Sequence, residues 1–349
     1  MKNKIAFFDA KPYDERSFIN TNERFGFELK FFKPHLSADT VQLAAGYDAV
    51  CIFVNDTLSA PVIDTLLKGG VKIVALRCAG YNNVDLHHAL NRLPVVRVPA
   101  YSPHAVAEHA FALLLTLNRK THRAYTRTRD FNFTLNGLMG FDLYGKTIGV
   151  VGTGKIGREA VKIARGFGMK VLAFDSYADA QFAKETSCEY TTMERIFAES
   201  DVLTLHCPLT PETVHMVNEK SIAAMKKGVV IINTGRGKLI HTKSLIDGLK
   251  SGQIGGAGLD VYEEETDYFF EDFSGSMIED DTLARLMTFP NVIITSHQAF
   301  FTEEAMSAIA ETTLNNLKLF FAENKRPNEI CYKCNIAPCP KETAQGRCF

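Results

Sequence analysis

Residues 146–160 limit the fold of this chain more than any other segment. An apolar run there is broken by three glycines and then continues with helical spacing, which predicts a strand, a tight turn and a helix. Gly152 permits the sharp turn, Gly154 lets a pyrophosphate lie against the backbone, and Gly157 lets the helix pack closely on the strand. The N-terminal N–H groups of such a helix attract an anion. The segment therefore predicts a dinucleotide-binding site.

A carboxylate after the next strand indicates which dinucleotide is bound. The apolar run 169–174 ends at Asp175, eighteen residues past Gly157. The carboxylate can accept a hydrogen bond from the 2′-hydroxyl of the adenosine ribose, and it would repel a 2′-phosphate. The sequence therefore predicts NAD rather than NADP. An aspartate that ends the strand by chance is the less favoured alternative.

Length and charge favour two domains and a small-molecule partner. The chain has 349 residues, enough for two cores, and a net charge of −1 with both signs interspersed. There is thus no basic surface for nucleic acid and no polybasic membrane anchor. The longest apolar helical stretch, 105–117, is interrupted by Glu108 and His109, and the apolar run at the N-terminus is too short for a signal peptide. The expected location is the cytoplasm.

The cysteines fall into two groups. Four lie in or beside apolar strands and are expected to be small buried hydrophobes in a reducing compartment: Cys51, Cys78, Cys188 and Cys207. Four others crowd the last nineteen residues: Cys331, Cys334, Cys339 and Cys348. Only the first pair of this second group has zinc spacing, and no histidine lies among them. A flexible tail with thiols is therefore favoured over a metal site, and no metal is predicted.

Alternating strands and helices predict an α/β protein with two doubly wound parallel sheets. The first sheet is expected to use residues 5–8, 29–32, 49–53, 72–76 and 95–98, and the second 147–151, 169–174, 202–205, 229–233, 258–262 and 292–296. Helices are expected at 61–67, from Pro103 to about Leu117, and at 302–323, with a surface excursion or subunit contact at 118–142.

The last of these helices is long enough to return across the molecule to the first domain. This predicts a discontinuous substrate domain, residues 1–101 and 300–335, around an inserted NAD-binding domain, residues 102–299, with a cysteine-bearing tail at 336–349.

Polar residues follow the strands of the second series. Arg236 follows the strand 229–233, Glu265 follows the strand 258–262, and His297 follows the last strand. In an open parallel sheet the carboxyl ends of the strands meet at one edge, and ligands bind there. Each residue alone could be structural, because a histidine after a strand or a Gly-Arg-Gly turn is common. Together they predict a site beside the dinucleotide.

These three residue types suit hydride transfer to a ketone, because a proton must reach the oxygen as the hydride reaches the carbon. His297 is the candidate acid, since an unperturbed imidazole has a pKa near ~6.5. Glu265 would favour the imidazolium and hold the ring. Arg236 can bind a substrate carboxylate with its planar fork and polarise the keto oxygen.

These residues also carry a family resemblance. The chain resembles the D-isomer-specific 2-hydroxyacid dehydrogenases from its start to about Ile330, through residues 151–157, 233–237, 259–262 with Glu265, and 297–300. The resemblance implies a Rossmann NAD-binding domain inserted into a flavodoxin-like substrate domain. It also implies that Arg236 binds substrate, that Glu265 pairs with the acid/base His297, and that Asp260 lies near the nicotinamide.

With the resemblance included, the predicted cofactor-binding residues are Gly152, Gly154, Lys155, Ile156, Gly157, Asp175, Cys207, Pro208, Thr234, Gly235, Arg236 and Asp260. Of the glutamates at 263–265, only Glu265 stands at the family's offset from Asp260.

Within the family, the chain is similar to the D-lactate dehydrogenase branch, through residues 77–83, 100–103 and 297–300. By this resemblance, backbone N–H groups near Cys78 and Ala79 hold the substrate carboxylate. Tyr101 and Phe300 crowd a pocket suited to pyruvate. A homo-oligomer, a dimer or higher, is expected by analogy.

Two alternatives stay open at this point, and two features depart from the family. The alternatives are a reductase for a different or larger 2-keto acid, and a binding protein that senses NADH without catalysis. The departures are His241, where family members commonly carry an aspartate, and the cysteine-bearing tail.

Overall fold

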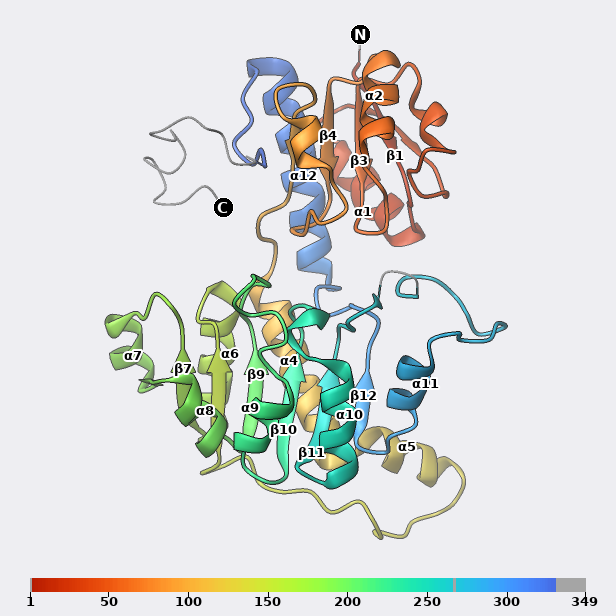
Figure 1. Ribbon diagram of the computed structural model, residues 1–349. Coiled ribbons are helices and arrows are strands. Elements are labelled where there is room, and N and C mark those ends of the chain that lie inside the picture. Colours follow the sequence, from red (N-terminus) through yellow and green to blue (C-terminus); the bar gives the residue numbers. More distant parts are fainter. Residues whose placement is uncertain (1, 266–267, 331–349) are drawn as a thin grey trace. The chain divides into compact units, whose positions relative to one another are not determined.

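The computed structural model describes residues 2–265 and 268–330, which divide into two compact units (Figure 1). Unit 1 contains residues 2–102 and the segment from 302 to 330, and unit 2 contains residues 103–301. The four cysteines predicted to form a tail lie outside the described residues.

Unit 1 is built on a parallel sheet of five strands in the order β2-β1-β3-β4-β5. The strands are β1 (Lys4–Phe7), β2 (Glu28–Phe31), β3 (Ala49–Ile52), β4 (Ile73–Leu76) and β5 (Val95–Val96). Every residue of β3 and β4 is buried, as expected for strands covered by helices on both faces.

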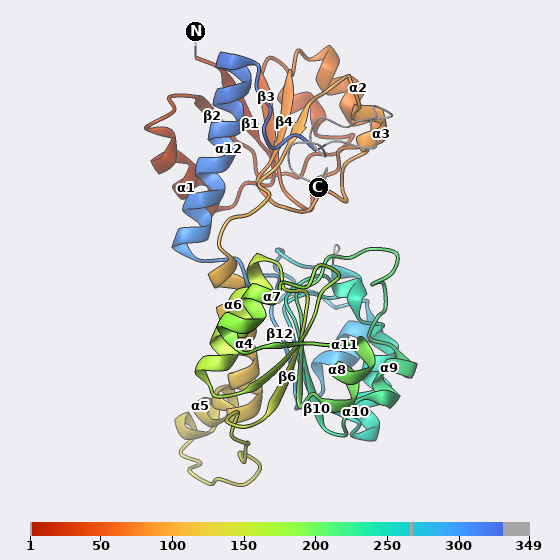
Figure 2. The ribbon, with the colours of Figure 1, turned by 90° about the vertical axis from the view of Figure 1, so that its left-hand side faces the viewer.

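The helices of unit 1 cover both faces of that sheet. They are α1 (Pro12–Asn22), η1 (Val41–Ala44), α2 (Ala60–Lys68), α3 (Leu86–Ala89) and α12 (Glu303–Glu323). Figure 2 shows α1 and α12 on one face and α2 and α3 on the other. Helix α12 begins where the Thr302 side chain accepts a hydrogen bond from the N–H of Ala305, and it contacts α1 and β4. The chain thus returns to its first sheet.

Unit 2 is built on a parallel sheet of seven strands in the order β12-β11-β10-β9-β6-β7-β8. The strands are β6 (Thr147–Val151), β7 (Lys170–Phe174), β8 (Glu189–Tyr190), β9 (Val202–Leu205), β10 (Val229–Asn233), β11 (Ile254–Leu259) and β12 (Val292–Ile294). The two sheets confirm the predicted fold class, with all pairs parallel.

Two layers of helices enclose the sheet of unit 2 (Figure 2). The helices are α4 (Pro103–Arg119), α5 (Thr121–Arg129), α6 (Lys155–Gly166), α7 (Ala180–Thr186), α8 (Met193–Glu199), α9 (Glu219–Ala224), η2 (Gly237–Leu239), α10 (Thr242–Ser251) and α11 (Asp281–Met287). Helices α4 and α6 pack on one face, and α8 to α11 pack on the other, each over its own apolar cluster.

Strand β11 begins and ends earlier than predicted. The strand occupies Ile254–Leu259 rather than 258–262. A Cβ at Gly258 would lie 2.8 Å from the Ile232 side chain and 3.0 Å from Leu113 of α4. The glycine therefore allows α4 to lie close on the sheet, which a propensity argument does not reveal.

Several elements of unit 2 were given no range by the prediction, among them α5 and β8. Helix α5 has no buried residue, so it lacks the apolar stripe that identifies a helix in a sequence. Strand β8 has only two residues. Helix α4 also extends two residues past the predicted end, to Arg119.

Candidate active site

The predicted catalytic residues follow three neighbouring strands of unit 2. In the sheet, Asn233 of β10 lies beside Leu259 of β11, and Leu259 lies beside Ile294 of β12. Arg236, Glu265 and His297 come three, six and three residues after these positions. All three therefore leave the same edge of the sheet.

The glycine turn after β6 has the shape that a dinucleotide needs. Gly152 has a φ of +91°, and a Cβ there would lie 2.7 Å from the backbone of Cys207. A Cβ at Gly157 would lie 1.9 Å from the carbonyl oxygen of Gly152, so only glycine permits this approach of α6 to β6. A Cβ at Gly154 would meet nothing within 4 Å, which leaves its backbone open to a ligand. The turn fits a bound pyrophosphate at the N-terminus of α6.

Asp175 lies at the end of β7 in a network that fixes its carboxylate. One oxygen accepts hydrogen bonds from the backbone N–H of Thr153 at 2.6 Å and from the Thr153 hydroxyl at 3.1 Å. The other accepts from the N–H of Tyr177 at 2.8 Å. The Thr153 hydroxyl also lies 2.8 Å from the hydroxyl of Tyr190 on β8. The negative charge is therefore held directly beside the glycine turn.

The remaining predicted cofactor residues lie along the same edge. Lys155 and Ile156 are the first residues of α6. Cys207 and Pro208 follow β9, and burial raises the pKa of the Cys207 thiol to about 11. Thr234 is buried, and Gly235 donates its N–H to the Asn233 side chain at 3.0 Å.

Arg236 lies in a turn that Asn233 holds in place. The Asn233 amide donates to the carbonyl of Arg236 at 2.9 Å, and the guanidinium of Arg236 donates to the carbonyl of Gly235 at 2.8 Å. A Cβ at Gly237 would lie 1.9 Å from the carbonyl oxygen of Tyr262, so this turn touches the backbone that leads to Glu265. No carboxylate of the described residues forms an ion pair with Arg236, whose charge is thus left for a ligand.

His297 and Glu265 form a direct pair. The Nδ1 atom of His297 lies 2.9 Å from Glu265 Oε1, and both side chains are about one fifth exposed, at 21% and 22%. The second oxygen of Glu265 accepts from the N–H of Tyr262 at 2.9 Å. Because Nδ1 faces the carboxylate, Nε2 is the nitrogen that can exchange a proton with a substrate.

Asp260 lies beneath the turn that carries His297. It is fully buried, and its two carboxylate oxygens accept from the N–H groups of Gln298 at 2.9 Å and Ala299 at 2.8 Å. Its carbonyl oxygen accepts from the N–H of His297 at 2.7 Å. His297 itself has a φ of +53°, an uncommon value for a residue with a side chain. Asp260 therefore fixes the backbone from which the imidazole projects.

Three of the predicted substrate-binding residues belong to unit 1. Cys78 and Ala79 follow β4, and Cys78 is buried, with its thiol 3.2 Å from the carbonyl oxygen of Gly80. The Arg97 guanidinium donates to the carbonyl of Ala79 at 2.8 Å and stacks over the Tyr81 ring at 5.1 Å. Tyr101 is half-buried in the segment after β5. The loop after β4 is thus held in place by hydrogen bonds to its carbonyl oxygens.

One aromatic side chain lies against His297, and another follows it closely in the sequence. Phe300, the fourth predicted substrate-binding residue, is buried three residues after it. Phe270 was not predicted, and its ring centroid lies 5.8 Å from that of His297. No sequence signal marked Phe270, because it lies in an irregular segment. His109 was also missed, although a polar residue inside the apolar helix 105–117 was a visible signal; its Nε2 lies 3.1 Å from the Thr295 hydroxyl.

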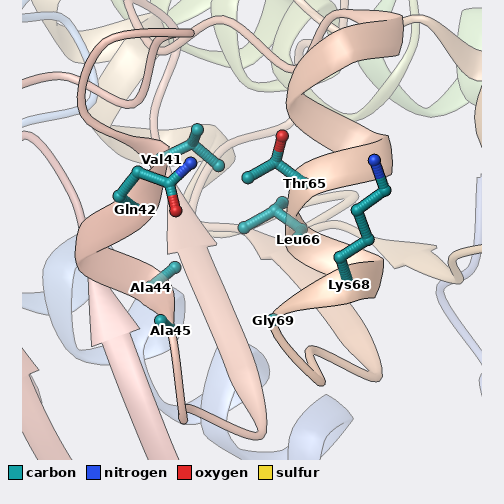
Figure 3. Close-up of a pocket in the computed structure, with 8 residues that line it drawn as sticks. All are labelled: Val41, Gln42, Ala44, Ala45, Thr65, Leu66, Lys68 and Gly69. Atoms are coloured by element: carbon teal, nitrogen blue, oxygen red, sulfur yellow. The ribbon is translucent and has the colours of Figure 1, made fainter.

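A separate hollow lies on unit 1, between η1 and α2 (Figure 3). It has a volume of about 310 Å³ and is lined by small, aliphatic and amide side chains, with Lys68 as its one charged residue. It contains no acid/base pair, so it does not resemble a catalytic site.

Each described helix is either too short or too polar to cross a membrane.

Comparison with known proteins shows the family of this chain. Residues 111–299 match the family model described as "D-isomer specific 2-hydroxyacid dehydrogenase, NAD binding domain". The chain is 53% identical over 328 residues to the D-lactate dehydrogenase of Escherichia coli (strain K12), and the match covers 94% of this chain and 99% of that protein.

Solved structures give the same result. The fold is similar to the apo structure of D-lactate dehydrogenase from Escherichia coli, with a TM-score of 0.87 and 51% identity over 94% of this chain and 100% of that chain. It is also similar to the pyruvate reductase of Chlamydomonas reinhardtii, with a TM-score of 0.89 and 42% identity over 94% of this chain and 98% of that chain.

Proposed function

This chain belongs to the D-isomer specific 2-hydroxyacid dehydrogenases, and we propose that it catalyses the reversible, NAD-dependent interconversion of pyruvate and D-lactate. The observation that carries this proposal is the 2.9 Å pair of His297 Nδ1 and Glu265, on the same sheet edge as a dinucleotide turn. The E. coli relative is named a D-lactate dehydrogenase, and the Chlamydomonas relative a pyruvate reductase.

The cofactor-binding residues of unit 2 fit NAD. The open backbone of Gly154 and the N-terminus of α6 would hold the pyrophosphate, and Asp175 would accept hydrogen bonds from the ribose hydroxyls. Bound NADH supplies the hydride. Unit 2 is accordingly the proposed NAD-binding domain, and unit 1 the proposed substrate domain.

His297 delivers the proton in the proposed reaction. The carboxylate of Glu265 stabilises the protonated ring and fixes its orientation through Nδ1, so the proton leaves from Nε2 toward the keto oxygen. In the reverse direction the neutral ring accepts the hydroxyl proton at the same atom. A positioned acid/base group of this kind contributes roughly 10²–10⁴-fold to the rate.

Arg236 binds the substrate carboxylate and polarises the keto oxygen. Its planar guanidinium offers paired donors, and the Asn233 side chain holds the turn in which it lies. The backbone N–H groups near Cys78 and Ala79 and the Tyr101 side chain are proposed to bind the same substrate. Phe270 favours a small substrate, because its ring beside His297 occupies space that a long side chain would need, and Phe300 is proposed to line the same pocket.

A panel of 2-keto acids with NADH tests the proposed function. We expect the highest kcat/KM with pyruvate, against oxaloacetate, hydroxypyruvate and phenylpyruvate, and a product of D configuration. A clear preference for a bulkier acid would replace pyruvate as the substrate. Binding of NADH without turnover of any acid would point to a sensor instead.

The preference for NAD can be tested through Asp175. We expect NADH to be used far better than NADPH, because the fixed carboxylate repels a 2′-phosphate. Asp175→Ser should narrow the gap between the two cofactors at unchanged pH. Equal use of both by the unchanged protein would remove Asp175 from this role.

We also propose that the segment 125–144 contacts a second copy of this chain. Six large side chains there are more than 60% exposed: Tyr125, Phe131, Phe133, Leu135, Met139 and Tyr144. The segment is nevertheless folded, because the guanidinium of Arg127 donates to the carbonyl of Asn136 at 2.7 Å and Lys120 donates to that of Met139. A large exposed apolar surface of this kind marks an interface. Phe131→Ser with Leu135→Ser should reduce the molar mass measured by light scattering to that of one chain.

The cytoplasm is the proposed location. The four cysteines in the described residues are free thiols, and three of them are buried, which suits a reducing compartment. Fractionation of the native host would test this proposal.

A further inference from the structure

A chain of polar side chains runs from helix α4 to the turn that carries His297. The Nε2 atom of His109 lies 3.1 Å from the hydroxyl of Thr295, and that hydroxyl lies 2.5 Å from Oδ1 of Asp260. His109 is also 3.4 Å from the same carboxylate oxygen. All of these residues belong to unit 2, and none was assigned a role above except Asp260.

The hydrogen atoms that join His109, Thr295 and Asp260 can be placed by counting donors. An ionised Asp260 only accepts hydrogen bonds, so the single hydrogen of the Thr295 hydroxyl points toward Asp260. The Thr295 oxygen then has only lone pairs to offer to His109. The Nε2 atom of His109 must therefore carry a hydrogen and donate it to Thr295.

Asp260, the last member of this series of side chains, fixes the backbone conformation of His297, the proposed acid. Asp260 accepts from the N–H groups of His297, Gln298 and Ala299, three consecutive residues. His297 lies in the left-handed region, which is unfavourable for a residue with a side chain. The turn therefore depends on Asp260, whose carboxylate is held on its other side by Thr295.

We propose that His109 is a positioning residue for His297, acting through Thr295 and Asp260. This inference rests on the proposed role of His297 as the acid/base. Donation from His109 keeps the Thr295 hydroxyl aimed at Asp260, and Asp260 keeps the imidazole in place for proton transfer. An error of about 1 Å in such a placement can reduce turnover by about 10².

The alternative is that His109 only fills space on the buried face of α4. A pair of substitutions separates the two roles. Leucine in His109→Leu fills the space without a donor, whereas glutamine in His109→Gln can place an N–H near the position of Nε2. His104→Leu is the matched control, since His104 lies on the same helix with its side chain 64% exposed.

We expect His109→Leu to lower kcat for pyruvate reduction by roughly 10- to 100-fold. KM for pyruvate and the affinity for NADH, measured by its fluorescence, should change little. His109→Gln should recover most of kcat, and His104→Leu should leave it unchanged. A kcat of His109→Leu close to that of the unchanged protein overturns the inference, and so does a His109→Gln variant as slow as His109→Leu.

Thr295 provides a second test if a substitution in α4 prevents folding. Thr295→Val should lower kcat about as much as His109→Leu, whereas Thr295→Ser should retain kcat. The double variant His109→Leu, Thr295→Val should be no slower than the slower single variant, because both substitutions break the same series of hydrogen bonds. Fully additive losses would overturn the inference. His297→Ala is measured alongside: if it retains turnover, the proposed acid/base is wrong, whereas an inactive His297→Ala with a normal His109→Leu rejects the inference alone.

Discussion

Two histidine–glutamate pairs lie close together in unit 2, and they differ in what holds them. Glu265 pairs with His297 at 2.9 Å, and Glu263, two residues earlier, pairs with His215 at 2.6 Å. Both glutamates follow β11, both histidines have a positive φ, and both contacts are partly buried.

The second oxygen of each glutamate shows the difference. That of Glu263 accepts from both the N–H and the hydroxyl of Thr242, at 3.0 Å and 2.8 Å, at the first residue of helix α10. Among the described residues, that of Glu265 accepts from the N–H of Tyr262 in its own turn. Glu263 thus joins the segment after β11 to the loop of His215 and to the start of α10. Glu265 instead binds the backbone of Tyr262 and the imidazole of His297.

The comparison shows that a His–Glu contact does not by itself identify an acid/base pair. His297 is placed by Asp260 just after β12, on the sheet edge from which the Arg236 turn also leaves. His215 lies in the loop between β9 and α9, where its N–H donates to the carbonyl of Lys238. We therefore assign catalysis to the pair with Glu265 and a structural role to the pair with Glu263.

The largest expected effect is that of His297→Ala against His215→Ala. The first should lower kcat by about 10³-fold or more, because it removes the proton donor, while NADH binding persists. The second should change kcat by no more than about threefold, since only a structural contact is lost. Steady-state kinetics and NADH fluorescence measure both. An inactive His215→Ala that still folds and binds NADH would reverse the assignment.

The next effect is that of Glu265→Gln. Glutamine can still accept a hydrogen bond from Nδ1, but it lacks the charge that stabilises the protonated ring. We expect kcat for pyruvate reduction to fall roughly 10- to 100-fold, with normal thermal stability. Glu263→Gln, measured in the same assay, should retain kcat within about threefold. Equal losses of kcat from the two variants would show that the two glutamates do not differ in their role in catalysis.

Substitution of Glu263, unlike that of Glu265, should change the stability of the fold. Burial alone would raise the pKa of this carboxyl, but hydrogen bonds from Thr242 and His215 lower it below its usual value of 4.5. A lowered pKa in the folded state adds stability above the pKa of the unfolded chain, and this stability is lost as pH falls through the folded value.

Glu263→Gln should therefore reduce the free energy of unfolding by about 1–3 kcal/mol at neutral pH. The difference from the unchanged protein should begin to shrink as the pH falls below the usual value of 4.5, where the unfolded chain becomes protonated, and it should disappear below the lower pKa of the folded state. Denaturant unfolding at several pH values measures this difference. A difference that does not depend on pH would mean that the charge of Glu263 contributes nothing.

The sequence carried enough information for the fold class and for the residues at the strand ends. Strands such as Val202–Leu205 and Val229–Asn233 are predominantly apolar runs, and their bounds were predicted without error. The spacing of Gly152, Gly154 and Gly157 is a local property, and its geometry follows from the absence of side chains.

Interactions between distant residues could not be predicted in this way. His109 and Thr295 are 186 positions apart, and only the packing of α4 on the sheet brings them together. The choice between Glu263 and Glu265 came from the family offset, because nothing local distinguishes adjacent glutamates. Gly258 of β11 is another example, because Leu113, which packs against it, lies on another element.

The smallest expected effect concerns His241, the residue next to the Glu263 pair. It is the N-cap of α10, but its side chain makes no capping hydrogen bond to the backbone; its Nδ1 lies 2.8 Å from the Ser244 hydroxyl instead. Its ring centroid is 5.0 Å from that of His215. Aspartate is a preferred N-cap, so His241→Asp should stabilise the fold by about 0.5–1 kcal/mol.

The charge of the new carboxylate would reduce this gain. Glu263 already places a negative charge at the N-terminus of α10, so the two carboxylates repel each other. The gain from His241→Asp should therefore be smaller than the gain from His241→Asn, which caps without a charge. Thermal melting of the two variants separates the effect of the cap from that of the charge, and turnover should stay within about twofold, because this region is structural. A large loss of kcat in either variant would extend the catalytic site to the Glu263 pair.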